Sequence, residues 1–362
     1  MSERISEEIS QAIKNLRLPL AFLIVCGHAD VLHFPIECNT GEWALYGDSI
    51  IKYPIAYISR VIFSPSVPLF FTISGYLFFV TGTLTKEYYK QKLKRRFYTL
   101  FLPYLVWNFL YLLLPIGTML ILGRDHSVLE LLQSIWSSPG VTIPADPPLW
   151  FVRDLMVCVI ISPILFWIIK SKIMGTIIYL CIISLWLVEP DWLSLPPGIS
   201  YLSLVFFTAG SYIGVYQVDL EVIINKWGGV FIFIFLILSL FNMFTTNYVL
   251  DGYRVVVDNI PILHKIGCVI GCIAYMSISI RLNPYLSKYN MGGSFVVFAA
   301  HWEILGITSK VVAQFIPSEI SQLMAFCVYI FYIVVAFIGS LLINKIISRS
   351  QLLTKLLAGG RG

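Results

Sequence analysis

Charged residues are scarce in this chain of 362 residues, and their scarcity decides its class. Asp, Glu, Lys and Arg make up 12% of the sequence, against about a quarter in soluble domains, whereas hydrophobic residues make up 58%. The mean hydropathy is +0.82. Apolar runs long enough to span a bilayer recur along the whole sequence. The composition therefore predicts an integral membrane protein, with no stretch left over for a soluble domain.

Other features are also missing from the sequence. The seven cysteines are odd in number and lack zinc or disulfide spacing; Cys268 and Cys272 share a helical face but have no neighbouring pair of histidines. We find no internal repeat and no low-complexity tract. The net charge of +5 is modest, and the basic residues cluster in predicted loops. We therefore expect no metal, no bound cofactor and no nucleic-acid partner.

Hydrophobic runs predict an all-α bundle of about ten membrane-spanning helices in a single domain, residues 1–362. The first run follows a mixed-charge segment and lacks a cleavage site of small residues, so we expect it to remain as a helix. Residues 1–15 and 347–362 would then be short terminal segments, the second without a fold of its own. The expected spans are 16–34, 60–82, 97–122, 149–169, 173–188, 201–217, 229–245, 260–280, 292–311 and 323–346.

The basic residues orient these helices. If both termini are cytoplasmic, the inner segments hold 18 of the 25 Lys and Arg residues, which fits the positive-inside rule. The other seven, including Arg60, lie in outer loops or inside spans. The outer loops are expected to be irregular, and their acidic and aromatic residues suit a hydroxyl-rich acceptor such as a sugar, although an interfacial belt equally explains Trp and Tyr. These loops are 35–59, 123–148, 189–200 and 246–259.

Two ionisable residues, Arg17 and His28, interrupt the first apolar run. A spacing of eleven residues turns an α-helix through about 1100°, so both side chains face one way, about 16 Å apart along the axis. In a helix over 16–34, Arg17 would lie near a membrane face and His28 near mid-depth. Ionisable groups are costly to bury in a bilayer and mark functional sites. The alternative is a snorkelling arginine and a histidine that hydrogen-bonds another helix.

The loop before the third span is strongly basic. Five cations between Lys90 and Arg96 either orient the chain or bind polyphosphate, for which arginine is geometrically suited. Within the second span, the small pair Ser74-Gly75 lets another helix or a ligand approach closely.

Polar residues in the fourth and ninth spans are further candidates. His301 and Glu303 lie deep in the ninth span, where His301 either lines an active site or hydrogen-bonds another helix. Trp150 and Arg153 lie at the outer end of the fourth. Adjacent residues on a helix do not face each other, so we do not expect an ion pair between Arg153 and Asp154. Arg153 is expected to meet the acceptor or a carboxylate on another helix.

Together, these segments resemble acyltransferase family 3, whose members are integral membrane O-acyltransferases that modify sugars and other hydroxyl acceptors. The residues that carry the resemblance are Arg17-x10-His28, Ser66–Phe79, Lys94-Arg-Arg-Phe97 before Leu102-Pro-Tyr104, Pro148–Arg153 and Ser294–Trp302.

The resemblance implies a ten-helix domain that uses cytoplasmic acyl-CoA, most often acetyl-CoA, as co-substrate. It makes His28 the match for the family's essential histidine and Arg17 the match for its basic residue. In one respect the chain departs from the family, which often has two arginines three apart before the third helix. Here only Lys92 and Arg95 keep that spacing.

Acyl transfer to a hydroxyl needs a base, and histidine is suited to this near neutral pH. His28 would either remove the hydroxyl proton or carry the acyl group as an acyl-imidazole. Asp30 lies about 200° round the helix from His28 and cannot orient its ring. The candidate donor-binding residues are Arg17, Lys92, Arg95 and Arg96, and the candidate acceptor or pocket residues are Ser74, Trp150, Arg153, His301 and Glu303.

We therefore predict a multi-pass enzyme of the bacterial inner membrane that moves an acyl group to a carbohydrate or lipid-linked glycan. The family resemblance favours acetyl as that group. One alternative is a transporter or flippase, which the missing repeat and missing paired broken helices disfavour. Its substrate or proton path would be Arg17, His28, Asp30 and Glu303. A noncatalytic sensor or scaffold would leave the intramembrane Arg and His unexplained.

Overall fold

The computed structural model divides the chain into two compact units that interleave along the sequence. Unit 1 holds Met1–Ser6, Pro68–Asp219 and Ile343–Gly362, and unit 2 holds Glu7–Val67 and Leu220–Leu342. The structure describes residues 5–29, 36–37, 43–44, 50–122, 127–138, 142–190, 192–245, 247–251, 254–258, 261–289, 291–316 and 320–360.

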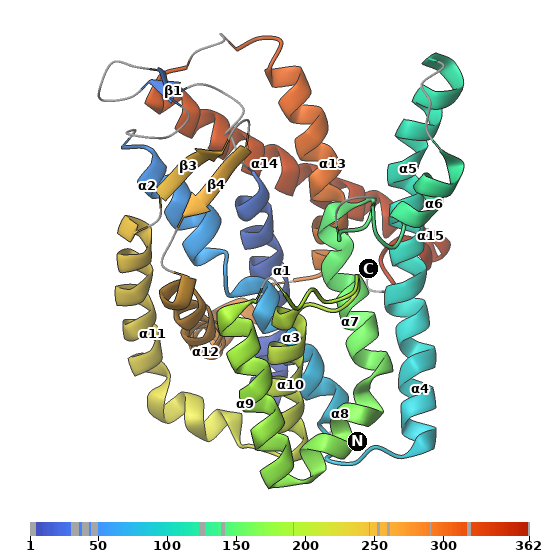
Figure 1. Ribbon diagram of the computed structural model, residues 1–362, viewed down its shortest axis with the longest axis vertical. Helices are drawn as coiled ribbons and strands as arrows, with labels where there is room; N and C mark the ends of the chain where they lie inside the picture. Colours follow the sequence, from blue (N-terminus) through green and yellow to red (C-terminus); the bar gives the residue numbers. More distant parts are fainter. Residues whose placement is uncertain are drawn as a thin grey trace. The chain divides into compact units, whose positions relative to one another are not determined.

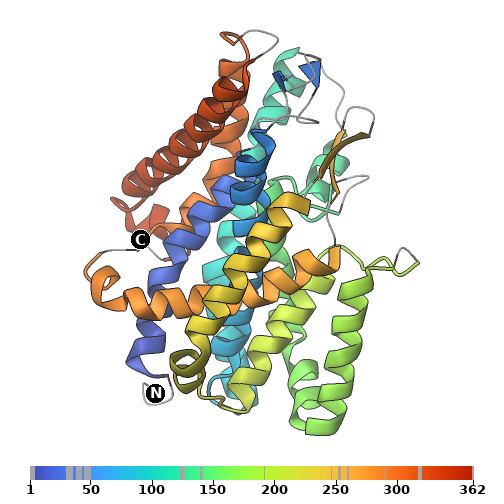
Figure 2. The same cartoon turned by 90° about the vertical axis from the view of Figure 1, so that its left-hand side faces the viewer.

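Unit 2 is mainly helical. Its helices are α1 (Glu7–His28), α2 (Lys52–Ala56), the π-helix η1 (Tyr57–Ile62), α11 (Leu220–Thr245), α12 (Pro261–Leu286), α13 (Ser294–Val312) and most of α14 (Gln322–Ile347). Helix α12 packs along α11 and against α1, and α13 also packs on α1 (Figure 1). Figure 2 shows α12 in orange crossing α1 in blue. Two antiparallel hairpins complete the unit, β1 (Ile36–Glu37) with β2 (Trp43–Ala44) and β3 (Asn247–Asp251) with β4 (Arg254–Asp258).

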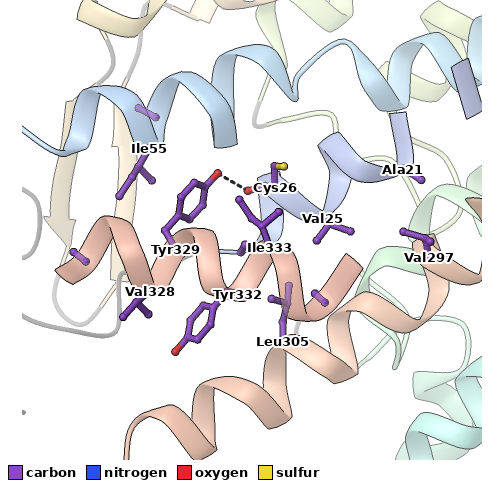
Figure 3. Packing of buried hydrophobic residues seen from close by; sticks show 14 of the residues in the cluster. Ala21, Val25, Cys26, Ile55, Val297, Leu305, Val328, Tyr329, Tyr332 and Ile333 are labelled. Carbon is purple, nitrogen blue, oxygen red and sulfur yellow. Dashed lines mark hydrogen bonds between the residues drawn. The ribbon is translucent and has the colours of Figure 1, made fainter. Parts of the chain in front are cut away.

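A buried apolar cluster joins α1, α2 and α14 (Figure 3). Val25 of α1, Ile55 of α2 and Ile333 of α14 belong to it, and each is at most 5% exposed. The Tyr329 hydroxyl of α14 donates a hydrogen bond of 2.9 Å to the Cys26 carbonyl near the end of α1. This cluster and its hydrogen bond hold the segment of α1 that precedes His28.

The candidate span Tyr53–Phe79 is broken in its first half. Helix α2 passes into the π-helical turn η1, and a turn at residues 63–65 separates η1 from α3. Pro68 has no N–H, so the Ser64 carbonyl loses its helical partner. Three side chains on one face of α12 donate to carbonyls at the break, Tyr275 to Ile62, Cys268 to Ser64 (3.3 Å) and Cys272 to Pro65 (3.6 Å).

Unit 1 holds the helices between residues 68 and 219 together with the C-terminal segment. They are α3 (Ser66–Phe79), which starts in unit 2, α4 (Lys86–Arg96), the π-helix η2 (Phe97–Phe101), α5 (Leu102–Leu122), α6 (Val128–Ser134), η3 (Pro147–Leu149), α7 (Trp150–Ile160), α8 (Ser162–Lys170), α9 (Lys172–Val188), α10 (Tyr201–Val215) and α15 (Gln351–Leu357). Glycines let α3 and α10 touch backbone to backbone. A Cβ built on Gly75 would lie 2.1 Å from the Phe207 oxygen, and one on Gly210 would lie 1.9 Å from the Thr72 oxygen.

The prediction of a helical membrane protein is confirmed. Among the described residues, six helices are long and apolar enough to cross a membrane, and a seventh is counted if Pro147–Ile160 and Ser162–Lys170, bent by 57°, form one span. The chain is therefore a multi-pass membrane protein. Each of the ten predicted spans overlaps an observed helix. The number of crossings, the single domain and the side on which the termini lie remain predictions.

The boundaries of the first helix were predicted wrongly. Helix α1 begins at Glu7, so the predicted terminal segment 1–15 is partly helical, and α1 ends at His28. Glu7 and Glu8 in its first turn favour this early start, because negative charge stabilises a helix N-terminus. His28 consequently lies at the end of α1. Residues 30–34, including Asp30, lie outside the described residues.

Four segments expected to be irregular contain regular structure. The loop 35–59 contains β1, β2 and α2, and the loop 123–148 contains α6. The other two are the C-terminal tail and the loop 246–259. In the tail, Gln351–Leu357 forms α15, which packs on α5, and the Trp107 indole donates a hydrogen bond of 2.9 Å to the Leu357 carbonyl. The loop 246–259 contains the hairpin of β3 and β4. Valines at 255–257 and the pair Asp251-Gly252 favour strands joined by a tight turn, a signal that the long apolar helices obscured.

The backbone contact between α3 and α10 leads to a stability prediction. Gly75→Ala forces the two helices apart, and we expect it to lower the free energy of unfolding by about 1–3 kcal/mol. The melting temperature of the detergent-solubilised protein measures the loss. Unfolding is monitored by a dye that reacts with the buried cysteines as they become exposed. The control is Gly306→Ala in α13, where an added Cβ meets nothing within 4 Å. Equal melting temperatures for the two variants would contradict the close approach.

Candidate functional site

Two histidines from distant parts of the sequence meet in unit 2. His28 is the last residue of α1, and His301 lies in the middle of α13, the helix that packs on α1. The His28 Nδ1 and His301 Nε2 atoms are 3.0 Å apart, and the two rings are nearly parallel, with centroids 5.1 Å apart and an interplanar angle of 29°. His301 is 0% exposed, whereas His28 keeps part of its surface exposed.

The Val297 carbonyl, which His301 meets through its other ring nitrogen, fixes the direction of the hydrogen bonds in this pair. His301 Nδ1 lies 3.1 Å from the Val297 carbonyl oxygen, which can only accept. His301 Nδ1 must therefore carry a proton, and in the neutral ring its Nε2 is then an acceptor. His28 Nδ1 donates to that nitrogen, and the proton at Nδ1 leaves His28 Nε2 with a lone pair. Such a nitrogen can take a proton from a hydroxyl group.

Aromatic side chains hold the His28 ring on two further sides. The Trp302 ring stands perpendicular to it, at 89° with centroids 5.5 Å apart. The Phe63 ring meets it at 60° and 5.9 Å, and Phe63 is the first residue after η1. A Cβ built on Gly27 would lie 2.7 Å from the Phe63 ring, so the glycine before His28 makes room for this contact. The His28 ring therefore has one well-defined orientation.

The sequence interpretation missed Arg60 as a site residue. Arg60 lies in η1, which packs on α1, three residues before Phe63, whose ring contacts the His28 ring. Turns of π-helix occur frequently at functional sites. The signal was present, because a lone cation at the start of an apolar span is an exception to the positive-inside rule. It was interpreted only in terms of topology.

The two other candidates of unit 2 do not join the histidine pair through any contact among the described residues. Arg17 lies eleven residues before His28 on α1 and is exposed. Glu303 is half-buried on α13, and neither of its carboxylate oxygens meets a hydrogen-bond partner in the described part of the chain. Glu303 is two residues from His301, about 200° round the helix, so it faces away from that ring.

The other three donor-binding candidates, Lys92, Arg95 and Arg96, belong to α4 of unit 1. Arg95 is exposed and Arg96 half-buried, both in its last turn. Lys92 instead points into the unit, where its Nζ donates to the Leu77 carbonyl at 3.2 Å and lies 4.9 Å from the Tyr88 ring centroid. Of these cations, Arg95 is the most open to a ligand.

The expectation for Arg153 and Asp154 was wrong. The Arg153 guanidinium folds back and donates from Nε (3.2 Å) and from a terminal nitrogen (3.1 Å) to the Asp154 carboxylate, and both residues are buried. The spacing rule concerns the direction in which side chains leave a helix, but the arginine side chain is long enough to bend round. Its other terminal nitrogen donates 2.7 Å to the Trp136 carbonyl.

The two remaining candidates also lie in unit 1. Trp150 and Ser74 are half-buried, and the Trp150 ring lies 6.3 Å from Phe71. Neither touches a charged side chain in the contacts that the structure describes. No group of three His, Cys, Asp or Glu residues among the described residues is arranged to hold a metal ion.

The buried Arg153–Asp154 ion pair should stabilise the fold and should not bind the acceptor. Asp154→Ala leaves the Arg153 charge buried without its carboxylate, and we expect a loss of about 3–5 kcal/mol in unfolding free energy. The double variant Arg153→Met, Asp154→Leu removes both charges and should unfold near the wild-type temperature. It should also keep the activity of the wild type. A stable double variant without activity would show instead that Arg153 serves the reaction.

Comparisons with known proteins identify the family of this chain. The chain is 26% identical to the succinoglycan biosynthesis protein ExoH of Rhizobium meliloti (strain 1021) over 259 residues, which cover 69% of this chain and 67% of that protein. No solved structure matches it. An acyltransferase domain model matches residues 10–345, almost the whole chain, which favours an enzyme over a transporter. The chain thus belongs to the acyltransferase 3 family of membrane proteins.

Proposed function

We propose that this protein transfers an acyl group from acyl-CoA to a hydroxyl group of a carbohydrate, with His28 as the general base. The observation that carries the proposal is the hydrogen bond between His28 Nδ1 and His301 Nε2. It leaves the other nitrogen of a partly exposed, fixed imidazole free to accept a proton. Membership of an acyltransferase family supplies the reaction class.

In the proposed reaction, His28 Nε2 takes the proton of the acceptor hydroxyl while the hydroxyl oxygen attacks the thioester carbonyl carbon. The tetrahedral intermediate then collapses, and the carbon–sulfur bond breaks. The departing thiolate takes the proton from His28, so the products are an ester and free CoA, and the base is restored. A stepwise route through an acyl-imidazole on His28 uses the same nitrogen as nucleophile.

The proposed donor is acetyl-CoA in the cytoplasm, with Arg17, Lys92, Arg95 and Arg96 as the candidate residues for its phosphates. Planar guanidinium groups match phosphate oxygens in pairs, which favours the arginines over Lys92. The exposure of Arg95 supports the same choice. CoA is a co-substrate in this proposal, and the protein needs no resident cofactor.

The proposed acceptor is a polysaccharide or a glycan on a lipid carrier. The support is the similarity to a succinoglycan biosynthesis protein, since succinoglycan is a polysaccharide. Several helices long enough to cross a bilayer suit an acceptor assembled at a membrane. We propose the bacterial inner membrane as the location, ten crossings with both termini in the cytoplasm, and Ser74, Trp150 and Glu303 as candidate acceptor-side residues.

The donor proposal is tested by removing the two arginines at the end of α4. We expect Arg95→Ala, Arg96→Ala to weaken binding of acetyl-CoA about tenfold or more, since phosphate contacts to arginine are strong charge-assisted hydrogen bonds. The deficit should shrink as salt rises, because added salt screens these contacts in the wild type. Calorimetry on protein in nanodiscs measures the affinity. The control Lys170→Ala, Lys172→Ala removes two other exposed cations of unit 1. Equal affinities for both double variants would refute the assignment.

The catalytic proposal is tested with His28→Gln. We expect transfer of labelled acetyl groups to fall by about 10²–10⁴-fold, as for the loss of a positioned base. Acetyl-CoA affinity and the melting temperature should stay near those of the wild type. His126→Gln, in the predicted outer loop 123–148, is the matched histidine control. Near-normal transfer by a folded His28→Gln protein would reject the mechanism.

The same assay separates the base from the acyl carrier. Protein incubated with labelled acetyl-CoA in the absence of acceptor is denatured and digested. Label on a peptide that contains His28 indicates an acyl-imidazole. Unlabelled protein that nevertheless catalyses transfer indicates direct attack by the hydroxyl.

A further inference from the structure

We infer that His301 is a positioning residue, which holds His28 in the tautomer whose Nε2 is unprotonated. The catalytic role of His301 rests on the proposed function, whereas the tautomer of His28 can be tested without it. It concerns a pair of imidazoles, 273 residues apart in sequence, whose nitrogens are 3.0 Å apart.

The Val297 carbonyl is the fixed end of the chain of hydrogen bonds. It lies one helical turn before His301 on α13 and accepts from His301 Nδ1 at 3.1 Å. The second His301 nitrogen then presents a lone pair towards His28, as long as the ring is neutral. Backbone geometry thereby sets the tautomer of the buried ring, and that ring sets the tautomer of its neighbour.

His28 responds at its own Nδ1. A free histidine side chain in water favours the tautomer with the proton on Nε2, which would place the proton on the nitrogen that a base must keep free. Donation from Nδ1 to His301 opposes this preference. His301 belongs to another helix, α13, so the tautomer of His28 depends on how α13 packs on α1.

Burial separates the roles of the two rings. His301 is 0% exposed and cannot touch a substrate, so it acts only through His28. When His28 takes a proton, its Nδ1–H becomes a charged donor to a neutral nitrogen, and charge-assisted hydrogen bonds are the stronger kind. A carboxylate would serve this purpose in water-soluble enzymes. In a membrane-spanning bundle, a neutral acceptor avoids the cost of burying a second charge beside the ring.

Two substitutions at His301 separate its hydrogen bond from its volume. In His301→Gln the amide oxygen can still accept from His28 Nδ1, whereas His301→Leu fills the space without an acceptor. We expect His301→Leu to lower kcat about 10- to 100-fold, as is typical when a ring-orienting partner is lost. KM for acetyl-CoA should change less than about twofold, since His301 touches no substrate. His301→Gln should recover most of the lost kcat.

A spectroscopic measurement tests the tautomer directly. The chain contains only five histidines, so nitrogen-15 labelling of histidine gives a spectrum that single substitutions can assign. Two-bond proton–nitrogen correlations show which ring nitrogen carries the proton. In the wild type we expect His28 with its proton on Nδ1. In His301→Leu the signals should move towards the form protonated on Nε2, and in His301→Gln they should stay near the wild type.

The outcomes are decisive in either direction. A wild-type His28 protonated on Nε2 alone overturns the inference, as does a folded His301→Leu protein with full kcat. If His301→Leu fails to fold, the wild-type spectrum and the His301→Gln variant still decide. If the protein moves no acyl group from acyl-CoA while the spectrum shows the Nδ1 form, the proposed function fails and the assignment of the tautomer survives.

Discussion

Hydrogen bonding of backbone groups within an apolar environment governs unit 2. A carbonyl without a partner costs several kcal/mol in hydrocarbon, so a membrane helix normally stays unbroken. Here the helix that follows α1 is broken over residues 63–65, and α12 supplies a tyrosine hydroxyl and two thiols to the exposed carbonyls. The break is possible only because the α12 side chains sit four and three residues apart, at Cys268, Cys272 and Tyr275, and so share one face.

The candidate site depends on this break in the helix and on the hydrogen bonds from α12 that stabilise it. The π-helical turn before it carries Arg60, and the first residue after that turn is Phe63, whose ring rests against His28. On the other side, α13 contributes His301 and Trp302 from one turn of helix. The site thus combines a regular helix, which fixes a hydrogen bond, with an irregular one, which brings a charge and an aromatic wall to the end of α1.

The sequence predicted the membrane class and a helix in each predicted span, because these depend on local composition and spacing. It also singled out His28 within an apolar run, and the catalytic role of that residue stays a prediction. It could not predict the His28–His301 pair, since a contact across 273 residues leaves no trace in a single sequence. The Arg153–Asp154 pair was misjudged because spacing rules describe where side chains start and not how far they reach. Helix ends were misplaced for a related reason: Glu7 and Glu8 look like loop residues, yet they stabilise the start of α1.

The bend of 57° between α7 and α8 has a consequence for how the chain enters its membrane. These helices have 11 and 9 residues, so at about 1.5 Å per residue neither half reaches across a hydrocarbon core of about 30 Å. The next two helices, with 17 and 15 residues, are also short. We expect this segment, α7 to α10, to be a poor substrate for insertion one helix at a time. It would instead leave the translocation machinery as a group, after longer helices have provided a protein surface to receive it.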